Sequence, residues 1–413
     1  MVLAAHPDDE TLGAGGLIAA MAARGAAVDV IVATAGEASH PGSPTHTRRE
    51  LAGIRRTELA AAVAQLAPDA TVHLLNLPDG GLAASRSGLD AALAAIVGPA
   101  VENTVLAAPW RTDGHTDHDT AGLAAAGLAR TLGIPLLEYP IWLWHWGTPA
   151  DIPAGLAVLP LDPAAAAAKA RAMATHVSQV EPLSDAPGDE ALLSQTVLAH
   201  FERGFESFAV TRPRPPREVF EDLYRRSPDP WEFESSFYEH RKRALSMAML
   251  PRPHFASVFE PGCSIGVLTA DLAARADAVT ATDISRRALD LARIRLAGTP
   301  QVTLARGAVP QDWPEGRFDL VVISEIGYFL QHSELSELAA RTETSLTEDG
   351  VVLLCHWRHR NEGWELTGDE VHGAFRARPG LRVFAEHREE DFRIDVLVRT
   401  AVEAPPDARA DPR

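Results

Sequence analysis

Two successive series of short apolar strands that alternate with amphipathic helices constrain most strongly what this chain can fold into. In the first half, strands are expected at residues 2–5, 28–34, 71–75, 104–108 and 135–139, and helices at 12–24, 46–66, 89–97 and 118–132. Two more helices are expected at about 163–180 and 189–205. A helix that connects two parallel strands packs on a face of their sheet, so this alternation predicts a mostly parallel, doubly wound sheet.

The second half repeats the alternation with different motifs. A helix is expected at about 234–249, followed by strands at 257–259, 278–282, 302–306, 320–324 and 351–356. The last two strands, at about 381–386 and 392–400, have no helix between them, so we expect an antiparallel pair. The segment TRPRPP at 211–216 can continue neither a helix nor a central strand. The sequence thus predicts an α/β chain of two doubly wound Rossmann-like domains, 1–210 and 229–400, with a proline-rich linker at 211–228 and a disordered tail at 401–413.

Composition and charge narrow the classes of partner. The net charge of −18 argues against a nucleic-acid partner or an anionic membrane surface, since both require a basic face. The sequence contains no signal peptide and no apolar run of membrane-spanning length, so we expect a cytoplasmic protein without membrane insertion. Two cysteines, Cys263 and Cys355, cannot form a disulfide framework and are expected to be reduced. The only lysines are Lys169 and Lys242, and the sequence specifies no oligomeric state.

Two motifs far apart in the sequence supply ligands for a catalytic metal. HPDDE at 6–10 follows the first expected strand, and HTDH at 115–118 follows the fourth. The carboxyl ends of parallel strands face one crevice, so the two loops can converge on one ion. Two histidines and one carboxylate suit a hydrolytic zinc site, which keeps one position open for water. Of Asp8 and Asp9 only one is needed as a ligand, and the other can accept the proton of the water. A histidine left over from the second motif can stabilise the oxyanion or protonate a leaving amine.

These motifs resemble those of the PIG-L/LmbE-like zinc deacetylases, which remove acetyl groups from N-acetylglucosaminyl compounds. The resemblance runs from residue 1 to about 209 and includes RRTE at 55–58, LPDG at 77–80 and HVSQ at 176–179. It implies an LmbE-like deacetylase fold in which His6, Asp9 and His118 bind Zn²⁺, Asp8 is the general base, His115 is the partner histidine, Asp117 is an orienting residue, and Arg55 and Asp79 contact the sugar.

Three alternatives accompany this resemblance. The native metal can be zinc or iron. The alternative for Arg55 and Glu58 is a surface ion pair one helical turn apart. Family members usually have more residues before the first strand, so we expect either an earlier start or another cover for that edge of the sheet.

Tryptophans alternate in the run YPIWLWHW at 139–146. On a strand, Trp142, Trp144 and Trp146 would share one face. That face can stack on a sugar ring or form a buried aromatic wall, and the sequence leaves both interpretations open.

A glycine-rich turn in the second half is typical of nucleoside binding. It reads Glu260-x-Gly262-x-Ser264-x-Gly266 after an apolar strand, and Asp283 ends the next strand. Glycines let the turn approach a ligand closely, and the carboxylate can accept hydrogen bonds from both ribose hydroxyls. The turn lacks the G-x-G-x-x-G spacing, and an antiparallel pair closes the series, so a methyl donor is favoured over a dinucleotide.

From about residue 228 to 400 the chain resembles the S-adenosylmethionine-dependent methyltransferases of the nodulation-protein-S type, which methylate an amine on a glucosamine-derived oligosaccharide. The matching segments include YEHRK at 238–242, AVPQDWP at 308–314, SEIGY at 324–328 and HWR at 356–358. The resemblance implies a class I methyltransferase fold with S-adenosylmethionine held by Glu260, Gly262, Ser264, Gly266 and Asp283, and with Ala308 and Val309 near the adenine.

The same resemblance implies where the methyl group is transferred. Ser324 and Glu325 would lie where the sulfonium meets the acceptor, and Glu325 or His356 would handle the amine proton. Capping of the following helix is the alternative for Glu325, and a satisfied strand-end residue is the alternative for His356. Trp231 and Tyr238 can form either a lid over the donor or core packing.

Together, the two resemblances predict a bifunctional enzyme that tailors a small-molecule amino-sugar conjugate. The first domain would remove an N-acyl group, and the second would methylate a nearby nucleophile, with the freed amine as the leading candidate. Two alternatives stay open. Either one domain is catalytic and the other is a ligand-binding scaffold, or the domains act on unrelated substrates, for instance with a hydroxyl as the methyl acceptor.

Overall fold

The computed structural model describes residues 1–98, 103–148, 150–152 and 155–400. The chain divides into two compact units, Met1–Pro215 and Pro216–Arg413, which we call the amino-terminal unit and the carboxyl-terminal unit. The tail expected at 401–413 lies outside the described residues. Each unit is built around one seven-stranded sheet, so the predicted fold class of two doubly wound α/β domains is confirmed.

The sheet of the amino-terminal unit has the strand order β3-β2-β1-β4-β5-β7-β6. Its strands are β1 (Val2–Ala4), β2 (Asp29–Thr34), β3 (Thr71–Leu77), β4 (Leu106–Pro109), β5 (Leu136–Tyr139), β6 (Ala157–Pro160) and β7 (Phe205–Thr211). The first five pair in parallel, as predicted, whereas β7 runs antiparallel to both β5 and β6. The strands β6 and β7 were not predicted.

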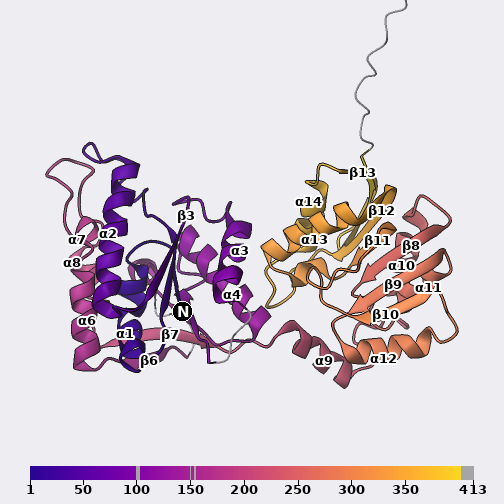
Figure 1. Cartoon of the computed structure of the whole chain (residues 1–413), viewed down its shortest axis with the longest axis horizontal. Helices are drawn as coiled ribbons and strands as arrows, with labels where there is room; N and C mark the ends of the chain where they lie inside the picture. The colour runs from indigo at the N-terminus through magenta and orange to yellow at the C-terminus, as the bar shows by residue number, and fades with distance from the viewer. Residues whose placement is uncertain (99–102, 149, 153–154, 401–413) are drawn as a thin grey trace, which may run out of the picture. The chain divides into compact units, whose positions relative to one another are not determined.

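Helices cover both faces of this sheet (Figure 1). They are α1 (Asp9–Ala23), α2 (Arg48–Leu66), α3 (Arg86–Val97), α4 (Thr116–Leu132), α5 (Leu143–Trp146), α6 (Pro163–Met173), α7 (Val177–Val180) and α8 (Gln195–Leu198). Alternate residues of β2 belong to different cores: Val30 and Val32 pack with α1, α2 and α6, whereas Ile31 and Ala33 pack with α3 and α4. This alternation is expected of a strand that is buried on both faces.

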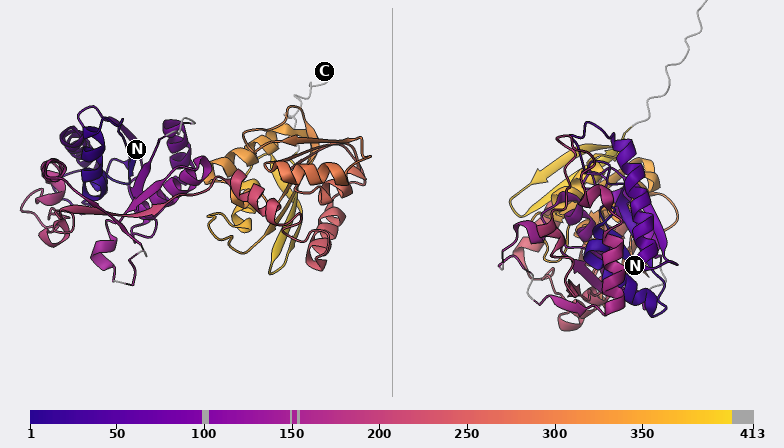
Figure 2. Two further views of the ribbon diagram at one scale, coloured as in Figure 1. Left: turned by 90° about the horizontal axis from the view of Figure 1, so that it is seen from below. Right: turned by 90° about the vertical axis from the view of Figure 1, so that its left-hand side faces the viewer.

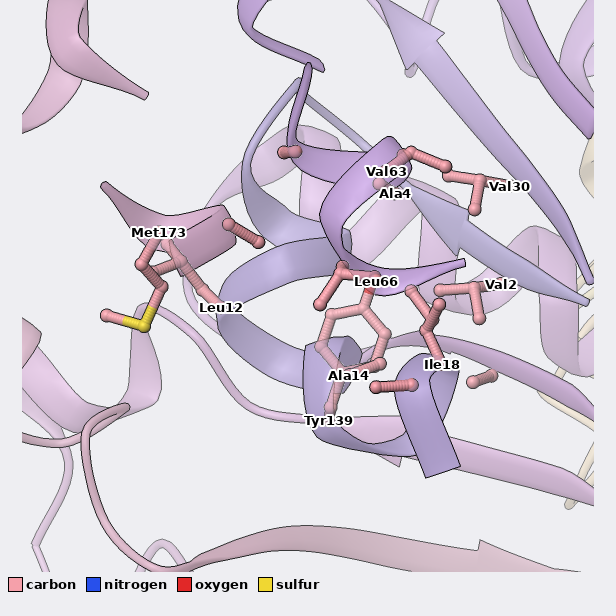
Figure 3. Close-up of a cluster of buried hydrophobic side chains, with 14 of the residues drawn as sticks. Val2, Ala4, Leu12, Ala14, Ile18, Val30, Val63, Leu66, Tyr139 and Met173 are labelled. Carbon is pink, nitrogen blue, oxygen red and sulfur yellow. The ribbon is translucent and has the colours of Figure 1, made fainter. Parts of the chain in front are cut away.

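Close packing between α1 and the sheet fixes the loop that carries the first motif. Tyr139 lies in the core beneath α1 (Figure 3) and its hydroxyl donates to the carbonyl of Leu3 at 2.5 Å. A Cβ at Gly13 would lie 2.0 Å from the Tyr139 ring, so only glycine allows the helix to approach this closely. The start of α1 is thereby held against the carboxyl ends of β1 and β5.

A buried ion pair ties α1, α6 and β7 together. The ammonium of Lys169 lies 2.7 Å from Glu206 Oε1 and donates to the carbonyl of Leu12 at 2.7 Å. Glu206 also accepts the backbone N–H groups of Gly16 and Leu17 in α1. Both charged side chains are buried, and each has the partners that a buried charge requires.

Two predicted elements of this unit are wrong. The helix expected at 189–205 is reduced to the single turn α8, because the segment is held by other bonds: Leu193 N–H donates to the carbonyl of Gln179, and the Asp189 side chain accepts the Thr45 and Ser184 hydroxyls. The tryptophan run expected as a strand forms the short helix α5 instead. The three tryptophans therefore do not alternate across a strand.

The carboxyl-terminal unit has the strand order β10-β9-β8-β11-β12-β14-β13. Its strands are β8 (Phe255–Pro261), β9 (Ala276–Asp283), β10 (Val302–Arg306), β11 (Phe318–Ser324), β12 (Leu346–Trp357), β13 (Leu381–Arg388) and β14 (Phe392–Arg399). The five strands up to β12 are parallel, and β14 runs antiparallel to β12 and β13. The predicted antiparallel pair is confirmed.

Helices again lie on both faces of the sheet, as two further views show (Figure 2). They are α9 (Pro216–Arg226), α10 (Phe237–Met249), α11 (Val267–Ala273), α12 (Arg286–Arg295), the 3-10 turn η1 (Gly327–Phe329), α13 (His332–Ser345) and α14 (Gly368–Arg376). Side chains from α10, α11 and α12 share one core with the sheet, and those from α13 and α14 share the other.

The helix α9 lies inside the stretch expected as a linker. Thr211 ends β7 and Pro216 begins α9, so residues 212–215 alone separate the two elements. Proline at a helix start is compatible with this, because its missing N–H is not needed in the first turn.

Among the helices of the described residues, none combines the length and the apolar character needed to cross a membrane. Cys263 and Cys355 are both buried and free.

Candidate functional site

The two histidine motifs meet at the carboxyl ends of β1 and β4. His6 follows β1, Asp9 begins α1, and His118 lies in the first turn of α4. His6 Nδ1 is 3.2 Å from His118 Nε2 and 3.5 Å from Asp9 Oδ2, and His118 Nε2 is 3.3 Å from Asp9 Oδ2. Ligand atoms on a tetrahedral zinc with bonds of about 2.0–2.1 Å lie roughly 3.3 Å apart. Both the chemistry and the spacing of these three atoms therefore fit a zinc ion.

Carboxylates hold the two histidines, and the backbone N–H groups of Ala5 and His6 donate to Asp9 Oδ2 at 3.1 and 2.9 Å. His118 Nδ1 lies 2.8 Å from Oδ2 of Asp113. His6 Nε2 lies 3.2 Å from Asp79 Oδ1 and 3.3 Å from Asp117 Oδ2. Because metal-binding imidazoles usually donate their second N–H to a carboxylate, both rings are oriented as ligands would be. Asp113 was missed in the sequence analysis, although its place five residues before His118 was visible.

His115 lies beside the three candidate ligands. Possible ligand atoms of His6, His115 and His118 lie within 4.8 Å of one another, as do those of His6, Asp79 and Asp117. The ligand atoms of His6, Asp9 and His118 are closer together than this, so these three residues are the better-fitted set. Burial and the two neighbouring histidines lower the pKa of His115, so its ring is neutral at pH 7. The backbone N–H of Asp117 points at His115 Nδ1 at 3.3 Å, which leaves Nε2 as the protonated nitrogen.

Asp8 sits in a strained backbone position next to the triad. Its φ of 134° lies in the region that favours glycine, and its side chain is buried. Burial raises the pKa of the Asp8 carboxyl, while the guanidinium of Arg55, with Nη2 at 3.1 Å from Asp8 Oδ2, opposes the shift. A raised pKa suits a carboxylate that accepts a proton near neutral pH.

The two residues expected to contact a sugar differ in exposure, since Arg55 is buried and Asp79 is partly exposed. Arg55 is only 4% exposed and donates to the carbonyls of Pro7 and Gly36 as well as to Asp8. Asp79 accepts the N–H of Ala38 at 2.7 Å and contacts His6. Both therefore brace the loops of the candidate site through hydrogen bonds to their backbone groups.

The alternative of a surface ion pair between Arg55 and Glu58 is wrong. Both residues are buried. Glu58 accepts the N–H and the hydroxyl of Ser178, each at 2.7 Å, so the HVSQ segment is attached to α2 through this carboxylate.

The three tryptophans of the 139–146 run have separate surroundings. Trp142 stacks on His115 with 5.6 Å between ring centroids, and His145 stacks on Trp142 at 4.7 Å. Trp144 instead stacks on His200. Trp142 and Trp146 are 40% and 49% exposed, so neither forms the buried wall that a strand would have given.

In the carboxyl-terminal unit, the glycine-rich turn joins β8 to α11. Gly262 has a φ of 75°, and a Cβ there would lie 2.2 Å from Ile326 Cγ2. Asp283, at the end of β9, accepts the N–H groups of Ser264 at 2.9 Å and Ser285 at 2.8 Å. Burial raises the pKa of Asp283 to about 6. The turn and the carboxylate are thus adjacent, as the motif predicts.

Glu260 supplies a second carboxylate at this turn. It is buried at the end of β8, and burial raises its pKa to about 8. Among the described residues, Glu260 Oε2 is buried without a hydrogen-bond partner. Leaving a buried polar atom unpaired is costly, so this arrangement fits a ligand that carries a donor or a cation.

The helix α9 brings residues to the turn that the sequence analysis did not identify. The hydroxyls of Tyr224 and Ser264 lie 2.5 Å apart. Glu221 accepts the N–H of Arg286 at 2.7 Å, which attaches α9 to the start of α12. Trp231 packs against Tyr224 at 5.5 Å between centroids. The spacing of Val219, Phe220, Leu223 and Tyr224 is helical, but the preceding prolines concealed this signal.

Glu325 directly follows β11, next to Ser324, and its carboxylate is fully engaged. Oε1 accepts from the Lys242 ammonium at 2.7 Å, and Oε2 accepts from the N–H of Trp357 at 2.9 Å and from the Tyr328 hydroxyl. Burial is the largest single influence and disfavours the charged form of Lys242, but the nearby Glu325 and Glu239 carboxylates help to outweigh it, and the pKa of the ammonium is raised. Glu325 therefore joins an ion pair rather than capping the following helix.

His356 is fully buried and both of its ring nitrogens have partners. Nε2 accepts the N–H of Gly327 at 3.3 Å, Nδ1 lies 3.2 Å from His372 Nε2, and His372 Nδ1 lies 2.8 Å from Asp395. Burial lowers the pKa of His356 well below its usual value. This arrangement favours the structural interpretation of His356 over a role with the amine proton.

The two residues expected near the adenine lie in the loop after β10. The N–H of Ala308 donates to Asp312 at 2.9 Å, which closes the loop, and Val309 packs against the core formed by β11 and α13. Because β10 neighbours β9, this loop and Asp283 lie at the same edge of the sheet.

Comparisons with known proteins find a different family model in each half of the chain. Residues 1–129 match the model of the PIG-L family, described as GlcNAc-PI de-N-acetylase. Residues 218–360 match the model of the family described as Nodulation protein S (NodS).

Curated relatives match the second half. Nodulation protein S of Bradyrhizobium diazoefficiens is 27% identical over 127 residues, which are 30% of this chain and 61% of that protein. Nodulation protein S of Rhizobium tropici is 31% identical over 106 residues, 25% of this chain and 43% of that protein. The chain therefore spans about half the length of these relatives.

Solved structures also match. A Pseudomonas syringae protein assigned as a methyltransferase is 40% identical, with 40% of this chain and all of that chain covered, at a TM-score of 0.36. The N-methyltransferase NodS from Bradyrhizobium japonicum WM9, in complex with S-adenosyl-L-homocysteine, is 18% identical, with 44% of this chain and 98% of that chain covered, at a TM-score of 0.41. Through its two family matches, the chain is a fusion of a PIG-L deacetylase-family domain with a NodS-like methyltransferase domain.

Proposed function

We propose that the amino-terminal domain is a zinc-dependent hydrolase that removes the N-acetyl group of an amino-sugar conjugate. The observation that carries this proposal is the triangle of His6, Asp9 and His118 atoms, whose spacing fits a tetrahedral ion. When bound, zinc would lower the pKa of a ligated water and polarise the amide carbonyl. Asp8, buried beside the triad, is placed to accept the proton of the attacking water.

His115 completes the proposed hydrolysis. As a neutral ring protonated on Nε2, it can donate a hydrogen bond to the oxyanion that forms when water adds to the carbonyl. Collapse of this intermediate breaks the C–N bond, and the amine leaves with the proton that Asp8 accepted. The products are acetate and a free amine. Asp117 supports both histidines, since its carboxylate contacts His6 and its N–H points at His115.

We infer that the carboxyl-terminal domain binds S-adenosylmethionine and transfers its methyl group to an amine. Asp283 fits the ribose hydroxyls, and the partnerless Glu260 oxygen fits the positively charged end of the cofactor. Because both Glu325 oxygens have partners, no free base is evident there, and the amine must arrive uncharged. Positioning of the nitrogen lone pair against the methyl carbon would then supply most of the rate.

The two activities fit a single sequence of reactions. Deacetylation exposes the kind of amine that a methyltransferase needs, and fusion raises the local concentration of the first product near the second site. The presence of the PIG-L match and the NodS match in one chain supports a link between the two reactions, and their order follows from the chemistry, since the amine must be freed before it can be methylated.

The test is mass spectrometry of products from purified, zinc-loaded protein with S-adenosylmethionine and a panel of N-acetylglucosamine conjugates. Loss of acetyl followed by gain of methyl on the same molecule is the expected result. In a parallel sample without the methyl donor, the reaction should end at the free amine. In a sample treated with a chelator, the starting conjugate should stay unchanged. Methylation of a hydroxyl, or loss of acetyl with the donor untouched, would overturn the sequential scheme.

A further inference from the structure

Asp113 is a fully buried carboxylate that binds four groups. Oδ2 lies 2.8 Å from His118 Nδ1 and accepts the N–H of Trp142 at 2.8 Å. Oδ1 accepts the N–H groups of Ile141 and Leu143, each at 2.9 Å. Asp113 thus contacts a candidate metal ligand and three consecutive backbone groups at the start of α5.

The short helix α5 owes its position to this residue. Beyond the three N–H groups, the indole N–H of Trp146 donates to the carbonyl of Asp113 at 2.7 Å. A Cβ at Gly114 would lie 2.4 Å from Trp146 Nε1, so the absence of a side chain there lets the indole lie against the loop. The segment is therefore fastened to Asp113 at both of its ends.

Through α5, Asp113 also acts on the second histidine of the HTDH motif. The Trp142 ring stacks on His115 at 5.6 Å with 21° between the planes, and it also stacks on His145 at 4.7 Å and 25°. His115 is only half-buried, so this stack restricts the ring in addition to the bond that its Nδ1 accepts from the N–H of Asp117. The backbone N–H of Trp142, which sets the start of the stack, is bound by Asp113.

We propose that Asp113 is a positioning residue that aligns both histidines of the motif: His118 directly, and His115 through Trp142. The inference rests on the proposed hydrolase function. A carboxylate is needed because an asparagine amide offers one acceptor oxygen and two donors, and it cannot accept on both sides at once. With His118 donating from Nδ1, its Nε2 lone pair faces His6 and Asp9, as a ligand requires.

Three variants of the full chain test the proposal. Asp113→Asn disturbs both the direct contact with His118 and the contact with Trp142 that positions His115. Trp142→Ala removes the stack on His115 and leaves the bond to His118. Trp144→Ala is the matched control, because the Trp144 ring stacks on His200. For each variant, zinc affinity is measured by competition with a chromophoric chelator, and kcat and KM are measured for acetate release. Thermal melting identifies variants that merely fail to fold.

We expect Asp113→Asn to weaken zinc binding by about 10–100-fold, as loss of an outer partner of a metal ligand usually does. Trp142→Ala should leave zinc affinity unchanged and lower kcat by about tenfold or more at constant KM. Trp144→Ala should change neither. The proposal is overturned if Asp113→Asn binds zinc like the wild type, or if Trp142→Ala and Trp144→Ala have equal kcat.

A measurement on metal-free protein separates this inference from the proposed function. Selective ¹⁵N-histidine labelling reports which ring nitrogen of His118 carries the proton. The Nδ1–H form is expected in the wild type and should be lost in Asp113→Asn. If the wild type neither binds zinc nor releases acetate, the hydrolase proposal fails whatever this spectrum shows. If it does both and the tautomer does not depend on Asp113, the positioning role fails alone.

Discussion

The two sheets have the same strand order, yet one candidate site consists mainly of side chains and the other mainly of a backbone turn. In each sheet the order is third, second, first, fourth, fifth, seventh, sixth, with the seventh strand antiparallel. In both, candidate residues follow the first and fourth strands: His6 and His118 in one unit, Gly262 and Glu325 in the other. At the carboxyl ends of the first and fourth strands, the amino-terminal unit thus has a cluster of polar side chains, whereas the carboxyl-terminal unit has mainly a glycine-rich backbone turn.

The difference follows from what each ligand demands. A metal ion needs lone pairs from side chains, so buried imidazoles and carboxylates crowd together and hold one another in place. A nucleoside needs room and backbone N–H groups, so glycines with positive φ and a few carboxylates suffice. Removing one side chain should therefore abolish the first chemistry, whereas adding one should damage the second.

The largest expected effect is on the first site. Asp8→Asn removes the proposed base without changing the size of the side chain, so kcat for acetate release should fall by about 10²–10⁴-fold. Methyl transfer, followed as S-adenosylhomocysteine formation with an amine substrate supplied directly, should be unchanged. Asp69→Asn, at an exposed aspartate of the same unit, is the control. Equal loss of both activities would show that the two sites are not chemically separate.

Substitution of each buried lysine should reveal whether the stability of each unit depends on its own ion pair. Removing one partner of a buried pair leaves an uncompensated charge and typically costs about 3–5 kcal/mol. We expect Lys169→Met to destabilise the amino-terminal unit and Lys242→Met the carboxyl-terminal unit by such amounts. Calorimetry should show one shifted transition for each variant. Arg171→Met, on the same helix as Lys169, should shift neither, and a shift of both transitions by either lysine variant would contradict the separation.

Adding a methyl group at the turn should harm the second site. Gly262→Ala should cost about 1–2 kcal/mol for the left-handed backbone and about 1–3 kcal/mol for the clash with Ile326. Gly298→Ala has a φ of 91° but open space around the added Cβ, so it should show only the backbone cost. Calorimetry and titration with S-adenosylhomocysteine measure both effects. Undiminished cofactor affinity in Gly262→Ala would argue against this turn as the cofactor site.

The smallest effect concerns pH. Burial lowers the pKa of His356 well below its usual value and also lowers the pKa of His372, so both are neutral in the folded unit at pH 7. The unfolded chain binds protons on these residues below about pH 6.5. As the pH is lowered below this value, the free energy of unfolding should therefore decrease by up to about 1.4 kcal/mol per pH unit for each histidine. Above pH 7 the contribution is constant. His356→Gln, which cannot titrate, should reduce the slope between pH 6.5 and 5 by about one proton; an unchanged slope in denaturant titrations would refute the assignment.

Strand–helix alternation predicted most of the fold. The parallel strands and long helices have strong periodicity, and twelve-residue or longer patterns such as α2 and α4 were readily visible. The failures are short elements set by tertiary contacts. Asp113 accepts three backbone N–H groups at the start of α5, and β7 pairs with β5 and β6 although only three of its seven residues are buried. No local pattern encodes such partners.

The candidate sites were predictable to a similar extent. Residues whose motif is local, such as those of HPDDE and HTDH, come together as the pattern indicates. Asp113 has a role that depends on a segment twenty-eight or more residues away, and Tyr224 reaches Ser264 across forty residues, so neither role is visible locally. His356 shows the converse case, since both ring nitrogens of this strand-end histidine contact groups inside the protein, on His372 and Gly327, that no local pattern indicates.

The scarcity of lysine has a practical consequence. The chain has one lysine side chain in each unit, and these are only 3% and 6% exposed at Lys169 and Lys242. Reagents that acylate lysine amines can modify either position only after its own unit has opened. Peptide mapping after timed acylation would therefore record the opening of the two halves independently, in one intact sample and without an introduced probe.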